Sequence, residues 1–158
     1  MKAASITEIK KELKDLEPQE VIDLCLRLGR FKKENKELLS YLLFESYDED
    51  AFIDKVKEEC DVMLAEVNTS SMYYIKKSVR KVLRHLKKHI RYSDNKKTEV
   101  ELLLYFCQKV MNFEPSLRAS SPMRNLFDRQ VKACEKALSL MHEDLQFDYR
   151  HSLEALSL

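Results

Sequence analysis

The chain has 158 residues, of which 44% are hydrophobic and 35% are charged, and its formal net charge is +1. This composition is too apolar for a disordered chain, and the small net charge gives no global attraction to nucleic acid or to anionic membranes. The longest apolar runs, such as 41–44 and 102–107, are far shorter than the roughly 20 residues of a membrane span. Residues 1–16 lack the continuous apolar stretch of a secretory signal. The sequence therefore predicts a cytoplasmic protein that does not bind membranes.

Apolar residues recur with the helical period along the chain, and no segment shows the alternation of a strand. The first helix is predicted over 7–16, where Ser5 and Glu8 fit a capping box. The second begins at Pro18, because a missing N–H costs nothing in the first turn of a helix. The third is predicted to begin at Asn35, whose side chain can cap it.

Two longer helices are predicted in the middle of the chain. The fourth runs over 49–67 with Asp48 as its N-cap, and the fifth runs over 71–92 with Thr69 or Ser70 as its N-cap. Each has an apolar stripe at helical spacing, so each is expected to bury one face against a neighbour.

The C-terminal third is predicted to form two further helices. The sixth runs over 99–112, and Thr98 with Glu101 fits a capping box at its start. The seventh runs over 122–146, and the tail from Phe147 is open to a short additional helix.

Short connections between consecutive helices predict antiparallel neighbours. We expect three helical hairpins, in which the second helix packs with the third, the fourth with the fifth, and the sixth with the seventh. Stacked hairpins would form an α-α superhelix of the HEAT or armadillo kind. An irregular helical bundle is the alternative, since the sequence shows no clear repeat. The predicted fold is thus a single all-α domain of about seven helices over 1–158.

Glycine and cysteine usage excludes several classes of site. Gly29 is the only glycine, whereas phosphate-binding loops and dinucleotide folds need several. The four cysteines form no CxxC pair, and each lies among apolar residues of a predicted helix: Cys25, Cys60, Cys107 and Cys134. We expect buried thiols in a reducing compartment rather than disulfides or a zinc site.

The predicted fifth helix carries charge of one sign only. Between Tyr73 and Tyr92 there is no acidic residue. The positions left by the apolar stripe hold eight cations: Lys76, Lys77, Arg80, Lys81, Arg84, Lys87, Lys88 and Arg91. A rigid row of cations can neutralise phosphates, which would give salt-dependent, sequence-independent binding of nucleic acid.

The predicted fourth helix offers the opposite charge. The segment 48–66 has eight acidic residues and two lysines, a net charge of −6 beside the +8 of 76–91. In an antiparallel hairpin these charges could offset one another in surface ion pairs worth about 0–1 kcal/mol each. The charge pattern favours this offset, with nucleic-acid binding as the alternative. A second basic cluster would extend a positive surface if it fell on the same side: Arg27, Arg30, Lys32, Lys33 and Lys36.

Two pairs of histidines are candidate metal ligands. His85 and His89 are four residues apart and lie on one side of the predicted fifth helix. The residues between them lack the Glu of a zinc-hydrolase helix, and the surrounding positive charge opposes a divalent cation. His142 and His151 have acidic neighbours but no defined third or fourth ligand. We therefore predict no metal site, no cofactor and no catalytic residues, since no nucleophile signature is present either.

Three segments of the N-terminal third resemble a group of small uncharacterised bacterial helical proteins. They are 6–13 (ITEIKKEL), 24–28 (LCLRL) and 31–45 (FKKENKELLSYLLFE). The resemblance implies an all-helical bacterial protein and brings no activity, cofactor or site.

Three functional hypotheses follow from these observations. The first is a non-enzymatic helical-repeat module that binds a protein partner, which requires an exposed apolar patch of several hundred Å². The alternative is nucleic-acid binding through the cations of 76–91, which requires that they are not paired with the acidic helix. An enzyme would require a pocket that gathers His85 or His142 with carboxylates of shifted pKa.

Overall fold

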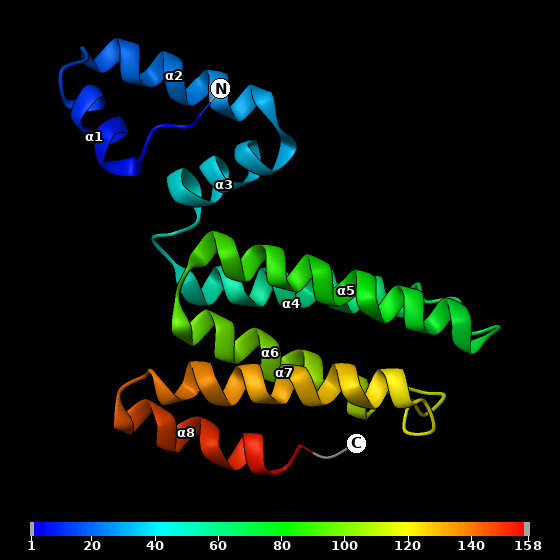
Figure 1. The fold of residues 1–158 in the computed structure, drawn as a ribbon. Helices are drawn as coiled ribbons and strands as arrows, with labels where there is room; N and C mark the ends of the chain where they lie inside the picture. The colour runs from blue at the N-terminus through cyan, green and yellow to red at the C-terminus, as the bar shows by residue number, and fades with distance from the viewer. Residues whose placement is uncertain (1, 157–158) are drawn as a thin grey trace. The chain divides into compact units, whose positions relative to one another are not determined.

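The computed structural model describes residues 2–156, which are all-helical and contain no strand (Figure 1). Eight helices are present in this part of the chain: α1 (Ile6–Lys14), α2 (Pro18–Phe31), α3 (Lys33–Phe44), α4 (Glu49–Ala65), α5 (Met72–Ser93), α6 (Lys96–Met111), α7 (Ser121–Ser139) and α8 (Glu143–Glu154). The all-α fold class is confirmed. The superhelical stacking of the hairpins stays a prediction.

The chain divides into two compact units, Met1–Phe44 and Glu45–Leu158. We call them the N-terminal unit, which holds α1 to α3, and the C-terminal unit, which holds α4 to α8. Each is described here by itself, and the single domain expected over 1–158 stays a prediction.

The N-terminal unit begins with the predicted capping box. The Ser5 side chain accepts a hydrogen bond from the Glu8 amide, and the Glu8 carboxylate accepts one from the Ser5 amide at 2.7 Å. Pro18 occupies the first turn of α2, as predicted. Asn35 does not cap α3, which begins two residues earlier; its amide group instead donates to the Leu28 carbonyl at 2.8 Å and ties α3 to α2.

The single glycine lies where α2 and α3 pack together. A Cβ atom at Gly29 would lie 3.0 Å from the Leu39 side chain, so a larger residue would require Leu39 to shift. The N-terminal unit otherwise has little core, because Tyr41 is the only buried residue in its three helices.

The C-terminal unit is built around α6. Helices α4 and α5 form an antiparallel hairpin, α6 packs against both, α7 packs along α6, and α8 packs against α7 (Figure 1). Since α6 has neighbours on several sides, even the three consecutive residues Leu102, Leu103 and Leu104 are buried. The expected partners α2 with α3, α4 with α5 and α6 with α7 are confirmed as packed pairs.

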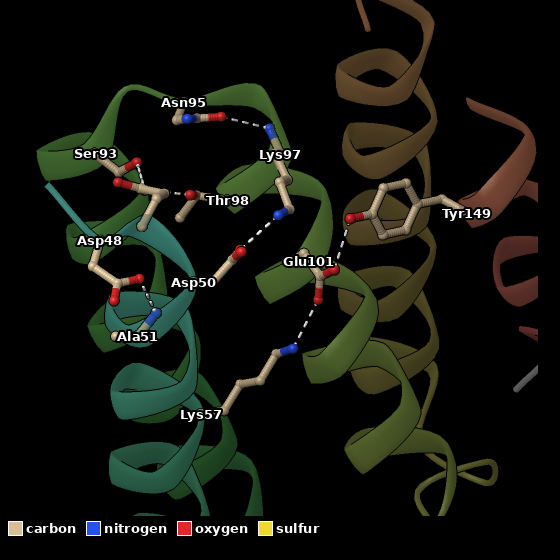
Figure 2. Close-up of polar contacts among 11 residues, drawn as sticks. Asp48, Asp50, Ala51, Lys57, Ser93, Asn95, Lys97, Thr98, Glu101 and Tyr149 are labelled. Atoms are coloured by element: carbon tan, nitrogen blue, oxygen red, sulfur yellow. Dashed lines mark hydrogen bonds and ion pairs between the residues drawn. The ribbon is translucent and has the colours of Figure 1, made fainter. Parts of the chain in front are cut away.

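Local capping signals were right at some helix starts and wrong at others. Asp48 caps α4, as predicted, and accepts from the Ala51 amide at 3.1 Å (Figure 2). The cap of α5 is Ser71 rather than Thr69 or Ser70. The predicted Thr98 box is also wrong, because Asn95 caps α6 and Thr98 lies buried inside the helix, where its hydroxyl donates to Glu49.

The predicted helix over 122–146 is wrong at its C-terminal end. Helix α7 ends at Ser139, and His142 adopts an extended conformation that caps α8. The amides of Leu140 and Met141 bond three residues back, to Ala137 and Leu138, which tightens and closes the last turn. No proline or glycine marks this break, so the apolar period runs across it without interruption.

Three of the four cysteines are buried as expected, and burial raises the pKa of Cys60, Cys107 and Cys134 to about 12. Cys25 is exposed, contrary to expectation, because α2 has no buried residue. Among the described residues, no helix has both the length and the apolar character that crossing a membrane requires.

Candidate nucleic-acid interface

Helix α5 separates apolar and cationic side chains onto opposite faces. Its buried stripe consists of Ile75, Val79, Val82, Leu83 and Leu86. At 3.6 residues per turn, the eight cations fall on the half of the helix that faces away from this stripe. The cationic face is therefore a geometric consequence of burying the apolar one.

Six of the eight cations are exposed to solvent: Lys77, Arg80, Lys81, Arg84, Lys87 and Arg91. From Lys77 to Arg91 they extend along about 21 Å of rigid helix, at about 1.5 Å per residue. Lys76 and Lys88 are half-buried, and the Lys88 ammonium lies 6.0 Å from the centre of the Tyr92 ring.

Seven of the eight cations on this face are not paired with the acidic helix. Apart from Lys88, none of the eight cationic side chains makes an ion pair or a hydrogen bond with any residue of 2–156. Within the described residues, the fold therefore supplies no counter-charge in contact with the other seven cations.

The acidic side chains of α4 find their partners mainly on α6. Asp50 pairs with Lys97 at 2.5 Å, and Asp61 pairs with Lys109 at 2.6 Å while also accepting from the Tyr105 hydroxyl. The hydrogen bonds from Lys109 and Tyr105 hold the pKa of Asp61 below its usual value. Thus α6, rather than the cationic face of α5, supplies the counter-charges of Asp50 and Asp61.

Figure 2 shows how this polar network joins three helices of the C-terminal unit. The Glu101 carboxylate on α6 accepts from Lys57 of α4 and from the Tyr149 hydroxyl of α8, each at 2.7 Å. Burial acts to raise the pKa of Glu101, but the Lys57 and Tyr149 hydrogen bonds and the nearby positive charges outweigh it, so the pKa is lowered. Nearby, Glu49 accepts from the hydroxyls of Ser93 and Thr98.

Exposed aromatic rings lie at the N-terminal end of the same helix. Tyr73 is 67% exposed and lies in line with the cations, and its ring meets that of Tyr74 edge-on with centroids 5.4 Å apart. No acidic residue lies in the first turn of α5, so its positive dipole end adds to the cationic face.

The second basic cluster belongs to the N-terminal unit. All five side chains are exposed, and Lys33 lies 3.6 Å from Glu37. Arg30, Lys33 and Lys36 help to line a groove of about 680 Å³ between α2 and α3, whose apolar lining includes Leu43 and Phe44. Its continuity with the cationic face of α5 stays a prediction.

The N-terminal unit also exposes many large apolar side chains: Ile6, Ile9, Leu13, Ile22, Leu24, Leu26, Leu28, Phe31, Leu42, Leu43 and Phe44. A second groove, of about 550 Å³, lies between α1 and α2 and is almost entirely apolar, with Phe31 at 75% exposure on its edge. These exposed apolar side chains are the kind of surface on which the protein-binding hypothesis depends, and that hypothesis stays a prediction.

The two histidine pairs behave differently. His85 and His89 lie next to Glu59 of α4, with Nε2 of His85 2.8 Å from the Glu59 carboxylate. Sequence inspection missed Glu59, and the only signal for it was that an acidic helix precedes the histidine-bearing one. His142 is exposed and caps α8, 3.4 Å from Asp144.

Comparison with known proteins adds no relative, because no family model, no curated protein and no solved structure matches this chain.

Proposed function

We propose that this chain is a non-enzymatic module that binds nucleic acid through the cationic face of α5. One observation carries the proposal: seven of the eight cations have no partner in the described chain, while Asp50 and Asp61 of the neighbouring acidic helix pair with lysines of α6. A positive surface that the fold leaves uncompensated is available to an external polyanion.

Phosphate groups suit this surface better than a specific small anion does. The cations are spread along the helix rather than gathered around one point, and no described acidic residue interrupts the row. Each Lys or Arg that neutralises a phosphate releases condensed counterions, which drives association without reading the base sequence. Tyr73 could stack on an unpaired base at the end of the row.

Fluorescence anisotropy with labelled DNA and RNA, as duplexes and as single strands, tests the proposal across a salt series. If about six phosphates are contacted, affinity should fall by about a thousandfold between about 50 and 200 mM salt. The combined change of Arg80, Arg84 and Lys87 to Glu should weaken binding by at least about a hundredfold, because each reversal removes one contact and adds repulsion.

A matched control uses three exposed cations of the same unit. Lys132, Lys136 and Arg150 lie off α5, and their change to Glu alters the net charge equally. This variant should keep most of the affinity. Equal loss in both variants would mean that total charge, rather than the α5 face, controls binding, and no binding by the wild-type chain at low salt would refute the function.

A second function is favoured by a separate observation in the N-terminal unit. Its apolar grooves and the cations around Leu43 and Phe44 fit an amphipathic helix of a protein partner with an acidic polar face. Covering these side chains would contribute about 25 cal/mol per Å² of apolar area. Titration with an acidic amphipathic peptide tests this: Leu28→Asp and Leu43→Asp should abolish binding, and unchanged affinity would exclude the grooves.

A further inference from the structure

We propose that Glu59, His85 and His89 form a binding site for a divalent transition-metal ion of the zinc class. The three side chains come from the two helices of one packed hairpin, Glu59 from α4 and both histidines from α5. Their candidate ligand atoms all lie within 4.8 Å of one another. The site is independent of the proposed nucleic-acid binding, since neither histidine belongs to the cationic face.

The distances place one carboxylate between two imidazole rings. Oε2 of Glu59 lies 2.8 Å from Nε2 of His85 and 4.0 Å from Nε2 of His89. The two rings follow one another along the helix, tilted by 54° with their centroids 4.4 Å apart. A tetrahedral zinc ion with bonds of about 2.0–2.1 Å would hold its ligand atoms about 3.4 Å apart. The Glu59–His85 contact must therefore lengthen and the Glu59–His89 contact must shorten, each by less than about 1 Å. Glu59 is exposed enough to move.

A hydrogen bond already orients His89 as a ligand. Its Nδ1 lies 2.9 Å from the carbonyl oxygen of His85, and because a carbonyl oxygen can only accept, the ring nitrogen must be the donor. The hydrogen therefore resides on Nδ1, and the Nε2 lone pair is left for the site. This backbone contact is the outer-shell support that metal-bound histidines usually have. Burial holds the pKa of His89 below its usual value.

The ligand set selects the class of metal. Two imidazoles and one carboxylate suit zinc and other first-row transition metals, whereas magnesium and calcium prefer all-oxygen sites. Three protein ligands leave at least one position for water, and Glu59 is 42% exposed to solvent. The nearby Lys88 opposes a cation, but its ammonium lies over the Tyr92 ring, and the Glu59 carboxylate contributes a compensating negative charge.

Calorimetric titration of the full chain with zinc chloride, in the absence of nucleic acid, tests the site. We expect one ion per chain and a rise in the thermal unfolding temperature, because the ion binds the folded state only. Absorption of the cobalt complex should report nitrogen and oxygen ligands without sulfur, since the three cysteines of the C-terminal unit are buried.

The variants His85→Asn, His89→Asn and Glu59→Gln should each reduce zinc affinity at least tenfold and remove the thermal shift. His151→Asn, on exposed α8, is the matched control and should change neither. Should a histidine variant fail to fold, Glu59→Gln still decides, because that half-exposed side chain is not part of the core. Unchanged affinity in Glu59→Gln or His89→Asn, equal loss in His151→Asn, or no zinc binding by the wild-type chain would overturn the proposal.

Discussion

Helices α4 and α5 belong to one hairpin and carry opposite charge, yet the structure uses their charges in different ways. Asp50 and Asp61 of α4 pair with Lys97 and Lys109 of α6, while six of the eight cations of α5 are exposed to solvent. The reason is where the charges lie on each helix: Asp50 and Asp61 of α4 reach lysines of α6, whereas α5 buries a single apolar stripe and turns its cationic half outward. Opposite charge on two consecutive helices therefore does not establish that their charged side chains form ion pairs with each other.

The largest effect on stability should come from the buried core of α6, the helix that packs against both α4 and α5. Leu103 of α6 is 2% exposed, so Leu103→Ala should lower the free energy of unfolding by about 2–5 kcal/mol through lost burial and a cavity. Chemical denaturation measures this value. The matched change Leu28→Ala, at an exposed position of α2, should cost less than about 1 kcal/mol. Similar losses for both would mean that Leu28 is covered in solution.

The next effect should come from removing a paired charge. Glu101→Gln keeps the shape of the side chain but weakens the hydrogen bonds from Lys57 and Tyr149. We expect a loss of about 1–3 kcal/mol in the free energy of unfolding, because these hydrogen bonds involve a partly buried charge. A loss below the error of denaturation would show that the polar network does not stabilise the C-terminal unit.

The pH dependence of the free energy of unfolding should reflect two carboxylates of the polar network, Glu101 and Asp61. Glu101 and Asp61 have pKa values below their usual 4.5 and 3.8 in the folded chain. The folded state thus favours their charged forms, and their contribution is fully present above those usual values. It should be lost as the pH falls through the lower folded pKa values. Denaturation at a series of pH values checks this, and the double change Glu101→Gln and Asp61→Asn should flatten the profile.

The smallest stability effect should come from the cationic face. Lys87→Gln, Arg84→Gln and Arg80→Gln should each change the free energy of unfolding by no more than about 0.5 kcal/mol, because none of these side chains has a partner in the described chain. A loss above about 1 kcal/mol for any one of these variants would instead show that its side chain is paired in solution.

Much of the fold was predictable from the sequence because its signals are local. The helical period gave the all-α class, and Ser5, Pro18 and Asp48 mark helix starts through contacts within four residues. The break between α7 and α8 was not predictable, since it uses neither glycine nor proline and the apolar period continues through it.

The candidate sites were predictable only in part, because their partners are distant in sequence. The eight cations were visible as one helix face. Whether acidic residues of α4 would pair with them could not be predicted, because Lys97 and Lys109 of α6 compete for those residues. Glu59 lies 26 residues before His85, so its place beside the two histidines required the register of the hairpin. Similarly, the exposure of Cys25 depended on how little the N-terminal unit buries.

The most direct test of the central claim is the slope of log affinity for nucleic acid against log salt concentration. We would measure it by anisotropy for the wild-type chain and for the Gln variants of Arg80, Arg84 and Lys87. If these side chains are free and contact phosphates, each change should reduce the slope by about one, and all three together by about three. A slope that the variants leave unchanged would contradict the assignment of α5 as the binding face.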